Sequence, residues 1–239
     1  MRRYSSAFGF ILFFLGIILT DWWPGEPVRA LVVDESKVYG YNRTRLIWNQ
    51  ARSRKMVTLT FDDGPNRQTD EILRILDRYR VRATFFLIGS QVSRHASLVS
   101  RIVQAGHDLG NHTYLHLCVS GATLEELERD IERAEKAIVN VSGRIPLYFR
   151  PPGGVITETV KEASGRRGYS IMLWDVDSRD WALRGESAVI VENVLQQTRP
   201  GSVILLHDLP QTVEALPLII EGLLNQGYSI VPASELFRY

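Results

Sequence analysis

The hydrophobic residues of the chain follow a regular order from residue 57 onward. Short apolar, β-branched or aromatic runs predict strands at residues 57–61, 83–87, 107–110, 147–150, 170–174, 202–206 and 228–231. Apolar residues at helical spacing predict helices between them, at residues 69–79, 98–105, 123–139, 157–164, 187–197 and 212–225. Strands that alternate with helices form βαβ units and a mainly parallel sheet. The pattern therefore predicts an α/β fold, either a small or incomplete barrel or an open doubly wound sheet.

The ends of the predicted helices carry local signals as well. Thr123 followed by Glu126 is the pattern of a capping box, and Ser97 precedes an apolar periodic run, so both predict helix starts. Glycines that would end helices in the left-handed conformation follow three predicted helices: Gly106, Gly168 and Gly227.

The N-terminal segment has a hydrophobic pattern of its own. Arg2 and Arg3 precede an apolar run at residues 7–19, which is typical of a secretory signal peptide or of an uncleaved membrane anchor. Ala30 offers a signal-peptidase site, but its distance from the apolar run slightly favours the anchor. Both alternatives place the rest of the chain outside the cytoplasmic membrane, because the positive end stays inside. We divide the chain into a signal peptide or N-terminal membrane anchor (1–30), a linker or N-terminal extension (31–54) and a folded domain (55–239).

Charge and cysteine content narrow the chemistry. The 28 basic and 27 acidic residues give a net charge of +1, which does not favour nucleic acid as a partner because a polyanion requires a basic face. The single cysteine, Cys118, excludes an intramolecular disulfide and a cysteine-based metal site. Any metal must therefore be held by the carboxylates or by the five histidines.

Side chains that carry chemistry follow five of the predicted strands. They are Asp62 and Asp63, then His112 and His116, then Arg150, then Asp175, Asp177 and Asp180, and finally His207 and Asp208. The carboxyl ends of parallel strands are where functional sites form in α/β barrels and sheets. We therefore expect these residues to meet at one face of the domain.

His112 and His116 have the spacing of a metal-binding pair. On a helical turn, residues four apart face the same side, so both imidazoles could reach one ion. Two histidines and one carboxylate make a three-ligand set, and the position left open for water is typical of catalytic zinc. Adjacent Asp62 and Asp63 repel each other unless cations lie beside them; a metal on Asp63 and an arginine beside Asp62 would satisfy both.

Five segments in this order resemble the motifs of the polysaccharide deacetylases, the NodB-homology enzymes of carbohydrate esterase family 4. The segments are Thr60-Phe61-Asp62-Asp63-Gly64-Pro65, His112-Thr113-Tyr114-Leu115-His116, Arg150-Pro151-Pro152-Gly153-Gly154, Asp177-Ser178-Arg179-Asp180-Trp181 and Leu205-Leu206-His207. The resemblance extends over residues 55–239 and implies that this region is the catalytic domain. It also implies the fold, which is a distorted, incomplete (β/α)7 barrel similar to a TIM barrel.

The resemblance assigns a catalytic set and a metal site. Asp62 would be the general base, Arg150 would contact it and keep it ionised, His207 would be the general acid, and Asp180 would orient that acid. The metal ligands would be Asp63, His112 and His116. The divalent metal would be Zn²⁺, with Co²⁺, Mn²⁺ and Ni²⁺ as alternatives.

Further positions are implied to bind the substrate. Trp181 and Leu205 would wall a pocket for the acetyl methyl group, and Thr113 would support the metal loop. Gly153 occupies a position that is commonly aromatic in the family, although its backbone N–H could still stabilise an oxyanion. Because Gly153 lacks that aromatic ring, the resemblance does not indicate which sugar the protein binds.

These observations together predict a metal-dependent hydrolase that removes acetyl groups from an N-acetylated glycan, either peptidoglycan or a chitin-like polymer of N-acetylglucosamine. The alternatives are an O-acetyl esterase on a xylan-type glycan and a non-catalytic glycan-binding wall protein. The expected partners are the glycan and, if the N-terminal segment is uncleaved, the membrane. We expect an exported protein that is anchored facing outside, secreted or located in the cell wall.

Overall fold

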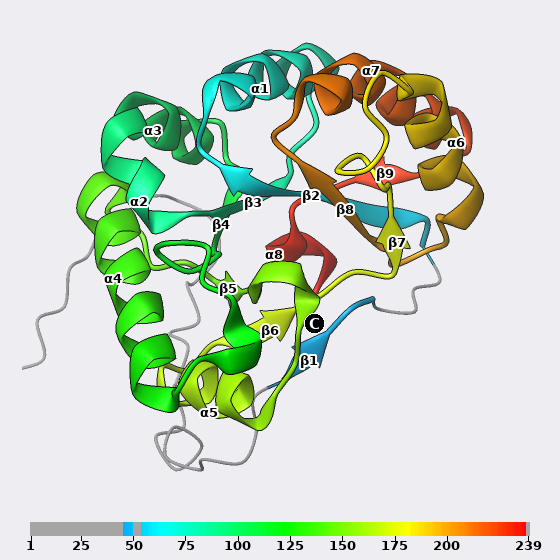
Figure 1. Cartoon of the computed structure of the whole chain (residues 1–239). Helices are drawn as coiled ribbons and strands as arrows, with labels where there is room; N and C mark the ends of the chain where they lie inside the picture. Colours follow the sequence, from blue (N-terminus) through cyan, green and yellow to red (C-terminus); the bar gives the residue numbers. More distant parts are fainter. Residues whose placement is uncertain (1–44, 50–53, 238–239) are drawn as a thin grey trace, which may run out of the picture. The chain divides into compact units, whose positions relative to one another are not determined.

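The computed structural model describes residues 45–49 and 54–237 (Figure 1). These residues belong to one compact unit of the chain. The predicted signal or anchor segment and most of the predicted linker lie outside the described residues. Within the described part of the chain, no helix combines the length and apolar character that crossing a membrane requires.

Nine strands of the described residues form one sheet, and its ladders are parallel. The strands are β1 (Leu46–Ile47), β2 (Met56–Gly64), β3 (Thr84–Leu87), β4 (Asp108–Asn111), β5 (Tyr148–Phe149), β6 (Ser170–Met172), β7 (Val176–Asp177), β8 (Val203–His207) and β9 (Ser229–Ile230). Their order is β1-β6-β5-β4-β3-β2-β8-β7, and β9 pairs with β2. No ladder among the described residues joins β1 to β7, so the barrel is incomplete. The predicted incomplete barrel is confirmed, and the open doubly wound sheet was the wrong alternative.

Helices lie around the outside of the strands, except for α8 (Ala233–Leu236), which lies inside the ring that the strands form (Figure 1). The others are α1 (Arg67–Tyr79), α2 (Gly89–Val92), α3 (Ala96–Gln104), α4 (Leu124–Ser142), α5 (Glu158–Arg166), α6 (Ser187–Gln197) and α7 (Pro210–Asn225), with short 3-10 helices at Ser93–His95, Val119–Gly121 and Pro152–Gly154. In parallel sheets both faces are covered, which explains why the strand sequences read as continuous apolar runs. Leu59, Phe61 and Phe85 are completely buried, and the last two rings stack with centroids 5.2 Å apart.

Most of the predicted elements are present in the structure. Each of the seven predicted strands and six predicted helices has a counterpart, and the Thr123–Glu126 capping box forms as expected. The glycines after three helices have positive φ angles, as predicted: Gly106, Gly168 and Gly227. Ser97 is not a helix cap, because α3 begins at Ala96 and its N-cap residue is His95.

Candidate functional site

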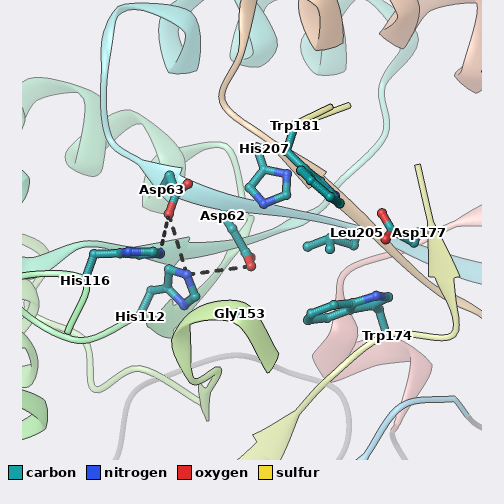
Figure 2. Close-up of a pocket in the computed structure, with 10 residues that line it drawn as sticks. All are labelled: Asp62, Asp63, His112, His116, Gly153, Trp174, Asp177, Trp181, Leu205 and His207. Atoms are coloured by element: carbon teal, nitrogen blue, oxygen red, sulfur yellow. Dashed lines mark ion pairs between the residues drawn. The ribbon is translucent and has the colours of Figure 1, made fainter. Parts of the chain in front are cut away.

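Asp62 and Asp63 lie at the carboxyl end of β2, where a bulge brings both carboxylates to one side. Successive residues of a strand normally face opposite sides. Here the pairing of β2 with β3 shifts register between Asp62 and Gly64, and Asp63 has φ 71°. An extra residue in the left-handed conformation re-aims its side chain. Figure 2 shows the result, with both carboxylates directed toward the pocket.

His112 and His116 lie in the loop that follows β4. The expectation of a helical turn was wrong, because this segment is irregular and His116 has φ 55°. Thr113, also left-handed at φ 67°, supports the loop: its N–H donates to Asn111 Oδ1 at 2.9 Å, and its hydroxyl accepts from Leu117 N at 3.2 Å.

Asp63, His112 and His116 converge at one point. Asp63 Oδ1 lies 3.3 Å from His116 Nε2 and 3.6 Å from His112 Nε2, and one ligand atom from each of the three lies within 4.8 Å of the others. Asp63 Oδ1 is buried and has no hydrogen-bond partner within the described structure. An orphaned carboxylate oxygen between two imidazole nitrogens fits a metal ion.

The orientation of His112 suits a metal ligand as well. Its Nδ1 lies 2.7 Å from the carbonyl oxygen of Arg150. Because a carbonyl can only accept, Nδ1 carries the proton and Nε2 presents its lone pair toward Asp63. Complete burial lowers the pKa of His112, although the neighbouring carboxylates partly oppose this effect, so the ring is kept in its neutral form.

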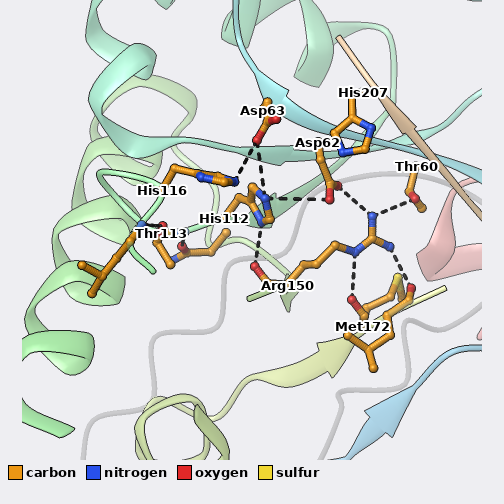
Figure 3. Close-up of polar contacts among 12 residues, drawn as sticks. Thr60, Asp62, Asp63, His112, Thr113, His116, Arg150, Met172 and His207 are labelled. Atoms are coloured by element: carbon orange, nitrogen blue, oxygen red, sulfur yellow. Dashed lines mark hydrogen bonds and ion pairs between the residues drawn. The ribbon is translucent and has the colours of Figure 1, made fainter. Parts of the chain in front are cut away.

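Arg150 supports Asp62 from below the pocket (Figure 3). Its Nη1 donates to Asp62 Oδ1 at 2.7 Å and to Thr60 Oγ1 at 2.9 Å. Its Nε and Nη2 donate to the carbonyls of Met172 and Leu173 at 2.9 and 2.8 Å. Arg150 is fully buried, and burial lowers its pKa while the Asp62 charge opposes that change. Saturated hydrogen bonding is what makes a buried guanidinium tolerable.

Asp180 supports His207 on the other side of the pocket. Its Oδ1 lies 2.7 Å from His207 Nδ1, and its Oδ2 accepts from His207 N at 2.7 Å and from Thr212 Oγ1 at 2.6 Å. Burial by itself lowers the pKa of His207, but the hydrogen bond and charge of Asp180, with the charges of nearby carboxylates, raise it to about 9. The ring is therefore protonated at neutral pH, and its Nε2–H is free to act as an acid.

These groups surround one cavity of about 380 Å³ (Figure 2). The lining residues are Asp62, Asp63, His112, His116, Gly153, Trp174, Asp177, Trp181, Leu205 and His207. Gly153 has φ 66°, and a Cβ added there would meet only Val155, at 3.8 Å, so the space above it is open. The structure thus brings each residue with an implied role into the cavity or directly behind it. Asp175, which was expected at the same face, instead accepts from Ser202 Oγ and Val203 N at the start of β8.

No role in the pocket was predicted for two lining residues, Trp174 and Asp177. Trp174 ends the fifth segment that was predicted as a strand, and an aromatic residue at a strand end was the signal that could have revealed it. Asp177 was expected at this face as one of the carboxylates that follow predicted strands, but no role was assigned to it. It ends β7, a strand that was not predicted.

Other titratable residues lie outside the site. Burial lowers the pKa of His107 to about 4, and its Nδ1 accepts from Ala83 N at 3.0 Å, so this histidine is structural. Cys118 is exposed. Burial raises the pKa of Asp208 to about 7; its Oδ2 accepts from the Thr69 hydroxyl, and its Oδ1 has no partner within the described residues.

Comparison with known proteins gives consistent matches. Residues 49–172 match the family model described as polysaccharide deacetylase. A peptidoglycan-N-acetylglucosamine deacetylase from Bacillus cereus is 41% identical over 199 residues, covering 80% of this chain and 92% of that protein. A chitooligosaccharide deacetylase from Bradyrhizobium sp. is 37% identical, covering 76% of this chain and 90% of that protein.

Solved structures share the fold. A peptidoglycan N-acetylglucosamine deacetylase bound to a naphthyl-substituted N-hydroxybenzamide has a TM-score of 0.77 and 34% identity, covering 80% of this chain and 92% of that one. A pseudoenzyme of carbohydrate esterase family 4 from Bacillus anthracis also has a TM-score of 0.77, with 29% identity, covering 82% of this chain and 70% of that one. The fold therefore does not distinguish active from inactive proteins, and the residues of the site must do so.

Proposed function

Because the chain belongs to the polysaccharide deacetylase family, we propose that it removes acetyl groups from N-acetylglucosamine units of a glycan, with peptidoglycan as the first choice and chitin-type oligomers as the second. The observation that carries this proposal is the convergence of a metal triad, a supported carboxylate and a supported imidazole on one cavity. This complete set favours an enzyme over a non-catalytic wall protein.

The proposed metal site consists of Asp63, His112 and His116, with zinc as the first choice and cobalt, manganese or nickel as alternatives. A divalent metal held there supplies a Lewis acid that lowers the pKa of a water ligand from about 15.7 to about 7. The three protein ligands leave room for that water, as catalytic zinc sites do.

Asp62 is the proposed general base. Arg150 occupies its Oδ1, so the proton of the attacking water passes to Oδ2, the oxygen that lies 3.8 Å from His112 Nε2. Asp62 accepts the proton as the carboxylate that is paired with the buried Arg150 guanidinium. General base catalysis of this kind contributes about 10²–10⁴-fold.

His207 is the proposed general acid. Its Nδ1–H is bound to Asp180, so the proton on Nε2 is the one available to the departing amide nitrogen. As the carbon–nitrogen bond breaks, Nε2 protonates the nitrogen and the sugar leaves as a neutral amine. The raised pKa of His207, about 9, keeps this proton in place at neutral pH.

The remaining lining residues bind the acyl group in this proposal. The backbone N–H of Gly153 would donate to the carbonyl oxygen as it becomes negative, and such a donor is worth about 10²–10³-fold in rate. Trp181 and Leu205 form the apolar wall for the methyl group; Leu205 is buried, whereas Trp181 is 56% exposed at the rim.

The test is a substrate panel with metal-loaded protein. Peptidoglycan, N-acetylglucosamine oligomers and acetylated xylan are incubated separately, and released acetate and product masses are measured. We expect acetate from the first two substrates, and we expect Asp62→Asn to abolish its release. Release from acetylated xylan alone would replace the proposal with an O-acetyl esterase, and release from none would exclude a deacetylase.

We also propose that the protein is exported, on the basis of the apolar segment at residues 7–19 and the wall-type substrate. Fractionation of cells and mass measurement of the mature N-terminus would separate a cleaved, secreted form from a membrane-anchored form. Full-length protein in the cytoplasmic fraction would contradict the proposal.

A further inference from the structure

Asp177 is a carboxylate in the pocket wall that the proposed mechanism does not use. It ends β7 and pairs with Leu205 of β8 in a parallel ladder. Residues paired in this way point to the same side of a sheet, so the two side chains lie next to each other, as Figure 2 shows. His207 is two residues beyond Leu205 and faces the same side, so Asp177 lies one layer deeper in the barrel than the proposed acid.

Only one of the two Asp177 oxygens has a partner in the described structure. Oδ1 accepts from Arg179 N at 2.8 Å, which closes a tight turn at the end of β7. No described residue donates to Oδ2, and no described cation pairs with it. Because the residue lines the cavity, this oxygen is available to a molecule that enters it.

The side chains next to this carboxylate in the cavity wall are apolar. Trp174, Trp181 and Leu205 line the same end of the cavity, while the metal triad lies at the other end (Figure 2). A charged oxygen in an apolar wall loses hydration when a ligand fills the space, and that loss is recovered only if the ligand donates a hydrogen bond. The methyl group of an acetyl substituent has no polar hydrogen, so it cannot donate that hydrogen bond.

We propose that Asp177 recognises a hydroxyl group on the acyl substituent, so that the enzyme removes N-glycolyl groups as well as N-acetyl groups. This inference rests on the proposed deacetylase function, because Leu205 and Trp181 are the proposed wall of the acyl pocket. A glycolyl group is an acetyl group in which a hydroxyl replaces one methyl hydrogen. Next to Leu205, that hydroxyl comes within the reach of Asp177.

The reaction follows the same course as acetamide hydrolysis. The oxygen of water bonds to the glycolyl carbonyl carbon, one water proton passes to Asp62, and the carbon–nitrogen bond breaks. His207 protonates the leaving nitrogen, and the products are the free amino sugar and glycolate. No oxidant, reductant or further reactant is required.

The experiment compares two matched substrates, chitotetraose with N-acetyl groups and chitotetraose with N-glycolyl groups. Asp177→Ser is the main variant, because a serine hydroxyl can still accept from Arg179 N while removing the second oxygen from the pocket. Glu186→Gln is the control, since it removes an exposed carboxylate outside the cavity. Acetate and glycolate are quantified with metal-loaded protein.

We expect the unmodified protein to hydrolyse both substrates. In Asp177→Ser, kcat/KM for the glycolyl substrate falls about tenfold or more, as expected for loss of a hydrogen bond to a charged group, and kcat/KM for the acetyl substrate changes by less than about threefold. In an Asp62→Asn background, calorimetry should show the same selective loss of affinity for the glycolyl oligomer. Glu186→Gln should change neither substrate.

Three outcomes would overturn the inference. Acetate release without glycolate release excludes the glycolyl activity and leaves the deacetylase function intact. An equal loss on both substrates in Asp177→Ser means that the carboxylate acts on the sugar or on the turn. The absence of both products overturns the proposed function and this inference together.

Discussion

Two buried charges lie behind the pocket, Arg150 behind Asp62 and Asp180 behind His207, and the protein holds them differently. Arg150 reaches across the barrel and donates to carbonyls at the end of β6. Asp180 accepts from the backbone of His207 and from Thr212 at the start of α7. The first charge therefore links the base to the barrel itself, whereas the second mainly sets the proton affinity of the acid. Substitution of Arg150 should therefore mainly reduce stability, whereas substitution of Asp180 should mainly change the pH dependence of activity.

The largest effect is expected on the base side. Arg150→Met leaves Asp62 as an uncompensated buried charge and releases two strand-end carbonyls, so the free energy of unfolding should fall by about 3–5 kcal/mol. Urea denaturation measures this change. Arg166→Met is the control: Arg166 pairs with Glu162 but is 39% exposed, so the change should stay within about 1 kcal/mol. Equal losses in the two variants would contradict the assigned role of Arg150.

Metal removal should have the next largest effect on stability, and it tests the proposed metal site of the pocket. At a metal concentration one hundred times the Kd, binding stabilises the folded state by about 2.7 kcal/mol, so a chelator should lower Tm measurably. His116→Ala should abolish the response to added zinc, whereas His95→Ala should keep it. A full zinc response in His116→Ala would exclude the proposed triad.

Substitution of the residue behind His207 should change how activity depends on pH. His207 is protonated below its pKa of about 9, so kcat/KM should fall as pH rises through that value. Asp180→Asn removes the charge that raises the pKa, so the alkaline limb should move down toward about 6.5, with a loss at pH 8 of about tenfold or more. Glu214→Gln, which removes an exposed carboxylate on α7, should leave the limb in place. An unmoved limb in Asp180→Asn would exclude His207 as the titrating acid.

The smallest effect is expected behind the bulge of β2. Thr69→Val removes the hydroxyl that donates to Asp208, which leaves that buried carboxyl without a partner and should cost about 1 kcal/mol of unfolding free energy. Thr58→Val is the matched control, because the buried Thr58 hydroxyl has no partner within the described structure. Urea denaturation should show no loss for the control, and a loss as large as that of Thr69→Val would contradict the interpretation.

The longer elements could be predicted from the sequence because each carries a full hydrophobic period. β1 and β7 were not predicted, because each is only two residues long and forms by pairing with β6 or β8; the equally short β5 and β9 lie inside longer segments that were predicted as strands. The gathering of the site residues at one face was also predictable, because they follow the carboxyl ends of predicted strands. The orientation of Asp63 was not, because it depends on a register shift between two distant segments.

The exact position of Asp177 in the pocket wall was not predictable for the same reason. Asp177 faces the cavity because it is in register with Leu205, and no local pattern in the sequence specifies that partnership. The metal loop shows the same limit, since the spacing of His112 and His116 is compatible with a helical turn, but the chain adopts left-handed angles at Thr113 and His116 instead.

The position of Cys118 has a practical use. It is the only cysteine of the chain, it is exposed, and it lies two residues beyond His116. A thiol-reactive fluorophore would therefore label the native sequence at a single site beside the metal loop, without any engineered substitution. Its emission would report ion binding and exchange in real time, independently of any substrate.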